Sequence, residues 1–342
     1  MSNPKLAIVG ARQFGGTMMV PLRSGNMTQN TSPNVIAIDW GTSSFRAYLV
    51  AHNGKVMDQK QSDNGILNVA NRDFDAVLHN ACEDWLAKWP NLNIVMCGMI
   101  GSKQGWKEAT YLSGDTGAID LANAVTELEW RGRNLRIVPG VQAKSFGGGP
   151  DVMRGEETIL VGALSLNAPK NGLYCLPGTH SKWVLIENGK IGAFSTFMTG
   201  ELFSILKKHS ILSALISEAP KVSKAEQDIA FLQGIDMATE KVELLHELFS
   251  LRAGVLTGDT HQTAIVDVLS GLLIGSELIS MKSMLDRAKQ NIILVSSGEI
   301  AARYHAALTH LSYEPILIDA EKACISGLLA VSLELPETAL TH

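Results

Sequence analysis

The chain has 342 residues, of which 46% are hydrophobic and 18% are charged, and its formal net charge is −5. This composition describes a well-packed globular protein, and the length favours two domains. The negative charge argues against nucleic acid or an anionic membrane as the main binding partner. No run of 18 apolar residues occurs in the sequence, so we expect no membrane-spanning helix.

The cysteine spacing and the composition of residues 1–33 indicate the cellular compartment of the protein. Four cysteines lie far apart without CxxC or Cys/His spacing, and we interpret them as buried apolar residues in a reducing cytoplasm rather than as metal ligands. Residues 1–33 contain only short apolar runs broken by Gly and Arg, which do not form a secretory signal. We therefore predict a poorly ordered extension at 1–33 and a cytoplasmic protein.

The organised part of the chain begins with a series of short strands. Apolar runs separated by glycine turns predict three strands, at 35–40, 44–51 and 55–61. Apolar residues at helical spacing predict a helix at 72–89, and a short apolar run predicts a buried strand at Asn93–Cys97.

The turn after the first of these strands is a candidate phosphate site. Asp39 lies near the end of the strand, and Gly41, Thr42 and Ser43 follow in a turn that exposes backbone N–H groups and small hydroxyls. Such a turn can bind phosphate oxygens, and a carboxylate beside it can hold a hydrated Mg²⁺. The alternative is an ordinary hairpin in which Asp39 caps the turn.

A second half of the chain repeats this architecture about 140 residues later. Strands are predicted at Leu173–Leu176, Trp183–Glu187 and Lys190–Thr199, and the turn Pro177–Ser181 follows the first of them. The repeat is one of architecture and not of sequence. Two such halves that face each other would place a pair of phosphate-binding turns on opposite sides of a cleft.

Later elements complete this second half. A strand predicted at Ile292–Val295 leads through Ser297 and Gly298 into a helix, an arrangement in which the helix N-terminus faces a phosphate or a ribose. Helices predicted at Val266–Ile279 and Lys322–Leu333 are interpreted as packing elements.

Five sequence blocks carry a family resemblance. DWGTSSFR (39–46) and LPGTHSKW (176–183) resemble the two phosphate loops of the actin/hexokinase/Hsp70-like kinases. Three further blocks, together with GTHSKW, resemble the 2-dehydro-3-deoxygalactonokinase family: GMIGSKQGWKEATY (98–111), DVMRGEET (151–158) and SSGEIAARY (296–304). The blocks also occur in the family's order, although the family pattern does not need the N-terminal extension.

The resemblance, which covers the chain from Val35 to Leu335, implies both a fold and a reaction. The implied fold is α/β, with two ribonuclease H-like (actin-like ATPase) domains, each a mixed sheet flanked by helices, and a cleft between them. The domains are expected at 34–166 and 167–335, with the last helix packing back on the first domain. The implied reaction transfers the γ-phosphoryl group of ATP, with Mg²⁺, to a hydroxyl of a 2-keto-3-deoxy sugar acid.

In such a kinase, both domains would hold ATP. Asp39 would bind Mg²⁺ through water. The residues implied to contact ATP are Gly41, Thr42 and Ser43 in the first turn, Gly178 and Thr179 in the second turn, and Ser297 and Gly298 near adenosine. For Thr179 the alternative is a turn hydroxyl that bonds to its own backbone.

The sugar acid would meet the first domain and a helix predicted at Val152–Leu166. Asp151, at the N-terminus of that helix, is the candidate base, with Glu156 and Glu157 as rivals and an N-cap role as the alternative. Arg154, one helical turn later, would bind the substrate carboxylate or else form an ion pair with one of these glutamates. The residues expected to line the substrate site are Asn68, Gly101, Ser102, Gln104 and Trp106.

Two other functions stay open at this point. A chaperone-type ATPase of the same superfamily would keep Asp39, Gly41 and Thr179 but would have no use for the glycine-bracketed loop Gly98–Trp106. A kinase that acts on a neutral sugar would not need Arg154 for substrate binding. The sequence also leaves open a homodimer and the epimer preference for the sugar acid.

Overall fold

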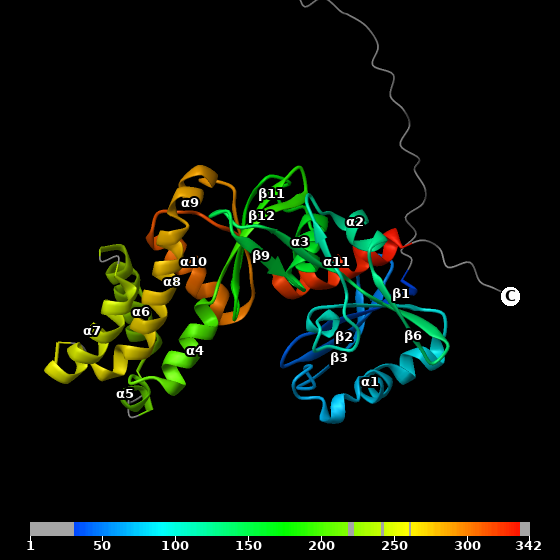
Figure 1. Ribbon diagram of the computed structural model, residues 1–342, viewed down its shortest axis with the longest axis horizontal. Coiled ribbons are helices and arrows are strands. Elements are labelled where there is room, and N and C mark those ends of the chain that lie inside the picture. Colours follow the sequence, from blue (N-terminus) through cyan, green and yellow to red (C-terminus); the bar gives the residue numbers. More distant parts are fainter. Residues whose placement is uncertain (1–30, 218–221, 241–242, 260, 336–342) are drawn as a thin grey trace, which may run out of the picture.

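The computed structural model describes residues 31–217, 222–240, 243–259 and 261–335. Most of the extension predicted at 1–33 lies outside these residues, and the first strand begins at Pro33. The described elements form two α/β halves, with a helical part attached to the second half (Figure 1).

The first half is built on a six-stranded mixed sheet with the order β3-β2-β1-β4-β7-β6. Its strands are β1 (Pro33–Trp40), β2 (Phe45–Ala51), β3 (Val56–Ser62), β4 (Asn93–Cys97), β6 (Thr126–Trp130) and β7 (Arg133–Ile137). β1 pairs antiparallel with β2 and parallel with β4. Helix α1 (Phe74–Lys88) packs Leu78 and Trp85 onto apolar residues of the sheet. The four strands and the helix predicted for this segment are confirmed.

The second half repeats this arrangement in a five-stranded sheet with the order β12-β11-β10-β13-β14. Its strands are β10 (Gly172–Leu176), β11 (Ser181–Glu187), β12 (Lys190–Phe197), β13 (Ile292–Val295) and β14 (Ile316–Ile318). β10 pairs antiparallel with β11 and parallel with β13, as β1 does with β2 and β4. The predicted repeat of architecture is therefore present, and the turns after β1 and β10 occupy equivalent positions.

A small sheet precedes the helix that was predicted to start at Val152. It consists of β5 (Tyr111–Ser113), β8 (Gly140–Lys144) and β9 (Pro150–Met153). The helix itself, α3, spans Glu156–Ser165, because β9 pairs with β8 and Gly155 adopts φ = 106° between the strand and the helix. The predicted position of Asp151 at a helix N-terminus is therefore wrong, since Asp151 is a strand residue.

Two helices connect the halves (Figure 1). α3 and α11 (Ala320–Glu334) pack against each other, and α11 also contacts β1, β4 and the short helix α2 (Ala118–Asn123). The helices lie close together, because a side chain at Gly162 or Gly327 would overlap the backbone of the other helix. Buried residues of both sheets join this helix pair in one apolar core.

The helical part lies at the outer side of the second half (Figure 1). Its helices are α4 (Thr199–His209), α5 (Ser213–Ser217), α6 (Lys224–Glu240), α7 (Leu244–Thr257), α8 (Ile265–Ser280) and α9 (Lys282–Ala288), while α10 (Gly298–His310) follows β13. Single 3₁₀ turns occur at Ala70–Arg72, Met99–Gly101 and Gln262–Ala264. Among the described residues, one helical stretch, Gln262–Ser280, is long and apolar enough to cross a bilayer. We interpret it as a core helix, because 67% of its apolar window is buried and α8 packs against α6 and α4.

Candidate functional site

The first turn joins β1 to β2. The backbone of Gly41 closes the turn with a 2.9 Å hydrogen bond, and Thr42 and Ser43 are exposed. Asp39 of β1 forms an ion pair with Arg46 of β2 at 3.3 Å. Burial raises the pKa of Asp39 above its usual 3.8, and Arg46 opposes that rise. A partly buried carboxylate therefore stands directly beside a turn of small, exposed residues.

A neighbouring segment supports this turn. The backbone N–H groups of Ile66 and Leu67 donate to carbonyls of the turn at 3.0 and 3.2 Å. A Cβ at Gly65 would lie 2.3 Å from the backbone of Ser43, so a larger residue would displace the turn. The side-chain amide of Asn68 donates to the carbonyl of Ser43 at 3.4 Å. The same amide donates a shorter bond, of 2.8 Å, to the carbonyl of Asp63, so Asn68 mainly holds its own segment, and its contact with the substrate stays a prediction.

The second turn follows β10 and has the same kind of support. Gly178 and Thr179 are exposed, and the N–H of Glu201 in α4 donates to the carbonyl of Thr179 at 2.9 Å. A Cβ at Gly200 would lie 2.4 Å from the carbonyl oxygen of Gly178, so α4 begins directly against the turn. Each turn is therefore backed by a glycine from another segment, which the sequence analysis did not identify.

A buried carboxylate on α8 connects the elements around the second turn. Glu277 accepts hydrogen bonds from Trp183 at 2.7 Å, from Tyr304 at 2.8 Å and from Thr199. The hydroxyls of Tyr304 and Ser181 lie 2.8 Å apart at the end of the turn. Burial raises the pKa of Glu277, and the bonded donors oppose that rise. This network could not be predicted from the sequence, because its members are far apart along the chain and match no motif.

The loop after β4 contains four of the residues that were predicted to bind the substrate. Gly101 is buried, Gln104 is exposed, and the hydroxyl of Ser102 donates to a carbonyl of its own loop at 2.7 Å. The indole of Trp106 packs against Trp40, with ring centres 6.3 Å apart. The partly buried ring of Trp106 therefore stabilises the loop, and its predicted place in the lining of the substrate site stays a prediction.

Arg154 reaches this loop from the turn between β9 and α3. Its Nη2 donates to the carbonyl of Ala109 at 2.8 Å, and its guanidinium lies 4.3 Å from the ring centre of Tyr111. Its Nε and Nη1 atoms are buried and have no hydrogen-bond partner among the described residues. Nη1 would lie 3.0 Å from a Cβ at Gly101. The predicted place on a helix face with Asp151 is wrong, but a buried guanidinium with free donors does lie against the predicted substrate loop.

Asp151 attaches β9 to the second sheet. Its carboxylate accepts hydrogen bonds from the N–H and the hydroxyl of Thr196 in β12, at 2.7 and 2.6 Å. The N–H of Val152 donates to the same carboxylate at 2.8 Å. Both carboxylate oxygens are therefore engaged, and the role of Asp151 as a base stays a prediction.

Two glutamates, Glu156 and Glu157, begin α3 and lie near residues of both turns. Oε1 of Glu156 lies 3.1 Å from Nζ of Lys182 in β11, and the negative charge of Glu156 contributes to the raised pKa of Asp39. Glu157 is buried, and its carboxylate accepts hydrogen bonds from the N–H of Gly155 and the hydroxyl of the next residue. Burial, together with the charge of Glu156, raises the pKa of Glu157 to about 7.

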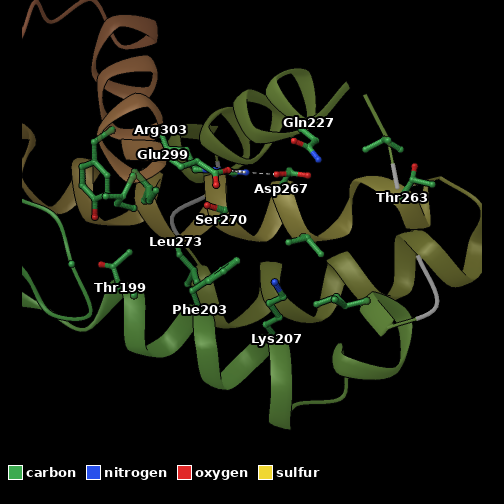
Figure 2. A pocket seen from close by; sticks show the side chains of 18 residues that line it. Thr199, Phe203, Lys207, Gln227, Thr263, Asp267, Ser270, Leu273, Glu299 and Arg303 are labelled. Atoms are coloured by element: carbon green, nitrogen blue, oxygen red, sulfur yellow. Dashed lines mark hydrogen bonds and ion pairs between the residues drawn. The ribbon is translucent and has the colours of Figure 1, made fainter. Parts of the chain in front are cut away.

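A pocket of about 530 Å³ lies in the second half, between α4, α6, α8 and α10 (Figure 2). Its lining includes Gly178 of the second turn and Glu299 and Arg303 of α10. Arg303 forms an ion pair with Asp267 of α8, and its Nη1 is buried without a partner among the described residues. The volume falls in the range of small-molecule sites, and the pocket opens onto a predicted phosphate turn.

The predicted adenosine contacts lie at the start of α10, next to this pocket. Gly298 is the first residue of α10, with φ = 67° and open space where a Cβ would point. The hydroxyl of Ser297 donates to Asp319, the N-cap of α11, at 2.9 Å. Ser297 therefore connects two helices here, and the nucleotide contacts of both residues stay predictions.

Comparison with known proteins gives a consistent result. A family model for 2-keto-3-deoxy-galactonokinases matches residues 39–331. A candidate 2-dehydro-3-deoxygalactonokinase of Rhizobium meliloti (strain 1021) is 38% identical over 302 residues, which cover 86% of this chain and 95% of that protein. The 2-dehydro-3-deoxygalactonokinase of Escherichia coli (strain K12) is 34% identical over 297 residues, with 87% and 97% covered.

The fold comparison agrees with the sequence comparison. The crystal structure of a candidate 2-dehydro-3-deoxygalactonokinase from Sinorhizobium meliloti matches with a TM-score of 0.76 and 35% identity, covering 87% of this chain and 97% of that one. The predicted fold class, α/β with two actin-like halves, is confirmed. These matches show that the chain belongs to the 2-keto-3-deoxy-galactonokinase family, whose members are phosphotransferases.

Proposed function

We propose that this protein is an ATP-dependent kinase that phosphorylates the 6-hydroxyl of 2-dehydro-3-deoxy-D-galactonate, giving the 6-phosphate and ADP. Family membership supports the substrate class. The reaction would serve galactonate breakdown in the cytoplasm, where ATP is available. The observation that carries the acceptor assignment is the buried guanidinium of Arg154, which has two free nitrogens beside the loop after β4.

ATP would be held by the two turns and the pocket of Figure 2. The exposed first turn offers Gly41, Thr42 and Ser43 to the phosphates, and the second turn offers Gly178 and Thr179. The pocket beside Gly178 would take the nucleoside, because it lies next to the second turn and is lined by both apolar and polar side chains.

Mg²⁺ would be held through water by Asp39. A carboxylate oxygen is a suitable ligand for this hard cation, and Asp39 stands beside the first phosphate turn. When bound, the ion neutralises charge on the phosphates of ATP. The side chains of this protein would orient ATP and the sugar acid toward each other, which is the main part of catalysis in phosphoryl transfer.

The carboxylate of the sugar acid would bind to Arg154. A buried donor without a partner costs free energy, and a substrate carboxylate that accepted a hydrogen bond from Nε or Nη1 would lower that cost. The structural alternative was an ion pair of Arg154 with Glu156 or Glu157. The Glu156 side chain pairs with Lys182 and meets only the backbone N–H of Arg154, and Glu157 bonds to Gly155 and Thr158. A kinase for a neutral sugar would leave the Arg154 nitrogens unsatisfied.

Replacement of Arg154 tests this assignment. Arg154→Ala should raise KM for the sugar acid by roughly 10- to 100-fold, since hydrogen bonds to charged groups contribute about 1.5–3 kcal/mol. KM for ATP should change much less. Arg154→Lys should recover only part of the loss, because an ammonium does not reproduce the planar guanidinium that lies over Tyr111 and bonds to the carbonyl of Ala109.

The matched control is Arg131→Ala, which removes an exposed arginine whose ion pair with Asp75 lies elsewhere in the first half. Steady-state ADP release, measured against each substrate in turn, gives the two KM values. Equal increases in both KM values for Arg154→Ala would show that Arg154 is only structural, and would contradict the proposed carboxylate contact.

A further inference from the structure

Two buried thiols and a carboxylate meet beside the first turn. Cys97 ends β4, Cys324 lies in α11, and their Sγ atoms are 3.8 Å apart. With a carboxylate oxygen of Asp39, these ligand atoms all lie within 4.8 Å of one another. Both cysteines are free thiols in the described part of the chain.

The spacing of the two sulfur atoms fits a tetrahedral metal site. A zinc–thiolate bond of about 2.3 Å in tetrahedral geometry places two thiolate sulfurs about 3.8 Å apart. The observed distance between the sulfurs is the same, so the thiols would not have to move apart to bind an ion. The carboxylate of Asp39 would only have to turn toward them.

The three groups come from separate, well-packed elements, and one of them reaches solvent. Cys97 and Cys324 are 1% and 5% exposed within the apolar core that joins β4 and α11. The side chain of Asp39 is 28% exposed, which gives an ion a route from the side of the first turn. The site is therefore preformed on its thiol side and open on its carboxylate side.

We propose that Asp39, Cys97 and Cys324 bind a thiophilic divalent ion such as Zn²⁺ or Cd²⁺, with a water as the fourth ligand. Each thiol releases its proton to solvent as its sulfur bonds to the ion. Binding has a consequence that rests on the proposed function: Asp39 can no longer hold Mg²⁺ beside ATP. A thiophilic ion would thus inhibit the kinase from within its own nucleotide site.

The direct test is a titration of the full-length, reduced and chelator-treated protein with Cd²⁺. Cadmium–thiolate bonds absorb in the ultraviolet, so binding by carboxylates or histidines alone gives no such band. We expect one equivalent of Cd²⁺ to produce the band and Zn²⁺ to remove it by competition. Cys324→Ser and Cys97→Ser should each weaken Cd²⁺ binding by more than the roughly 10- to 100-fold that loss of an outer-shell partner causes.

The control is Cys175→Ser, which replaces another fully buried thiol outside this cluster and should leave the titration unchanged. Cys324→Ala provides a second variant in case the serine disturbs folding, which circular dichroism would show. Absence of the band in the unaltered protein would overturn the proposal whatever the variants do. Equal Cd²⁺ affinity in Cys324→Ala would overturn it as well.

An activity assay then separates the site from its consequence. Zn²⁺ should inhibit ADP release by the unaltered protein, a chelator should restore it, and Cys324→Ala should keep its activity in the presence of Zn²⁺. If the protein showed no kinase activity at all, the proposed function would fail, but the Cd²⁺ titration would still decide whether the metal site exists. Cd²⁺ binding without any inhibition would refute the role of Asp39 as a shared ligand.

Discussion

Glu156 interacts with residues beside both turns. Its carboxylate pairs with Lys182 near the second turn, and its negative charge raises the pKa of Asp39 beside the first turn. Its partner Lys182 has a side chain that is only 5% exposed, so the pair is largely buried between α3 and β11. In phosphoryl transfer the base mainly has to orient the acceptor hydroxyl and accept its proton. Asp151, the predicted base, already has both carboxylate oxygens bonded within the protein. Both oxygens of Glu156 are engaged as well, Oε1 by Lys182 and Oε2 by the N–H of Arg154, so the two carboxylates are equally bonded and their variants have to separate them.

A pair of isosteric variants distinguishes these carboxylates. If Glu156 is the base, Glu156→Gln should lower kcat by at least about a hundredfold, the lower end of acid–base contributions. Asp151→Asn should then lower kcat much less, because its amide can still accept the hydrogen bond from the N–H of Thr196. Single-turnover ADP formation at saturating substrates measures both effects. A hundredfold loss for Asp151→Asn, with little loss for Glu156→Gln, would restore Asp151 as the base.

Loss of stability has to be excluded in this comparison. Removal of one partner from a buried ion pair can cost about 3–5 kcal/mol, so Glu156→Gln leaves Lys182 with an unpaired buried charge. Urea unfolding of both variants shows whether each is folded under the assay conditions. A folded variant with a low kcat then reports on chemistry rather than on the fold.

At the residue scale, turns formed by neighbouring residues could be predicted from the sequence, but contacts between distant residues could not. The turns at Asp39 and Thr179 could be predicted, because a strand, a small-residue turn and a second strand form a local pattern. The hydrogen bonds of Asp151 to Thr196 and the packing of Trp106 on Trp40 could not, because they depend on which distant segments become neighbours.

At the scale of elements, the two turns depend on the close approach of a second segment. Gly65 lies against the first turn, and Gly200, near the start of α4, lies against the second. Neither turn has room for a methyl group between its backbone and the supporting segment. The supporting segments therefore set the positions of the exposed N–H groups and hydroxyls that would meet the phosphates.

Alanine at either glycine should weaken ATP binding. Gly65→Ala or Gly200→Ala would push the adjacent turn away, and we expect the dissociation constant of an ATP analogue to rise by about tenfold or more, because displaced turns lose aligned hydrogen bonds to the phosphates. Isothermal titration with a non-hydrolysable ATP analogue measures the effect directly. Gly147→Ala is the matched control, since its nearest neighbouring atom would be 3.9 Å away. Unchanged ATP affinity in both variants would contradict the assignment of these turns.

The strands of the two sheets were easier to predict than the residues at which a helix begins. The strands β1 to β4 and β10 to β13 follow from apolar runs and glycine turns, and their shared order follows from the architectural repeat. The start of α3 was predicted at Val152, because helical periodicity continues through the apolar residues before Glu156. Pairing of β9 with β8 across the turn at Ser145–Gly149 overrides that local preference, with partners such as Lys144 and Pro150.

At the scale of the whole molecule, the junction of the two halves contains a buried carboxyl group whose ionisation opposes folding. Glu157 lies where α3 packs against α11, and its pKa is about 7 in the folded protein against the ordinary 4.5. Between these values the folded protein holds a proton that the unfolded chain has released. The free energy of unfolding should therefore fall as pH rises from about 4.5 to about 7, and this contribution should level off above that range.

The variant Glu157→Gln should lack this dependence. The difference between the two pKa values corresponds to roughly 3 kcal/mol. As the pH rises from 5 to 8, the free energy of unfolding of the unaltered protein should fall by up to about that much, and that of Glu157→Gln should not. Urea unfolding at both pH values measures it, and Glu187→Gln, which changes an exposed glutamate of β11, is the control. The same pH dependence in Glu157→Gln and in the unaltered protein would show that Glu157 does not titrate in this range.

As a whole molecule, the protein would act as one kinase built from two halves, with ATP held by the turns after β1 and β10 and the sugar acid held by Arg154. The most direct test is ADP release by the purified chain with ATP, Mg²⁺ and a panel of acceptors. We expect rapid ADP release with 2-dehydro-3-deoxy-D-galactonate and very little with neutral hexoses or without an acceptor. Steady ADP release without an acceptor, or equal rates with neutral hexoses, would contradict it.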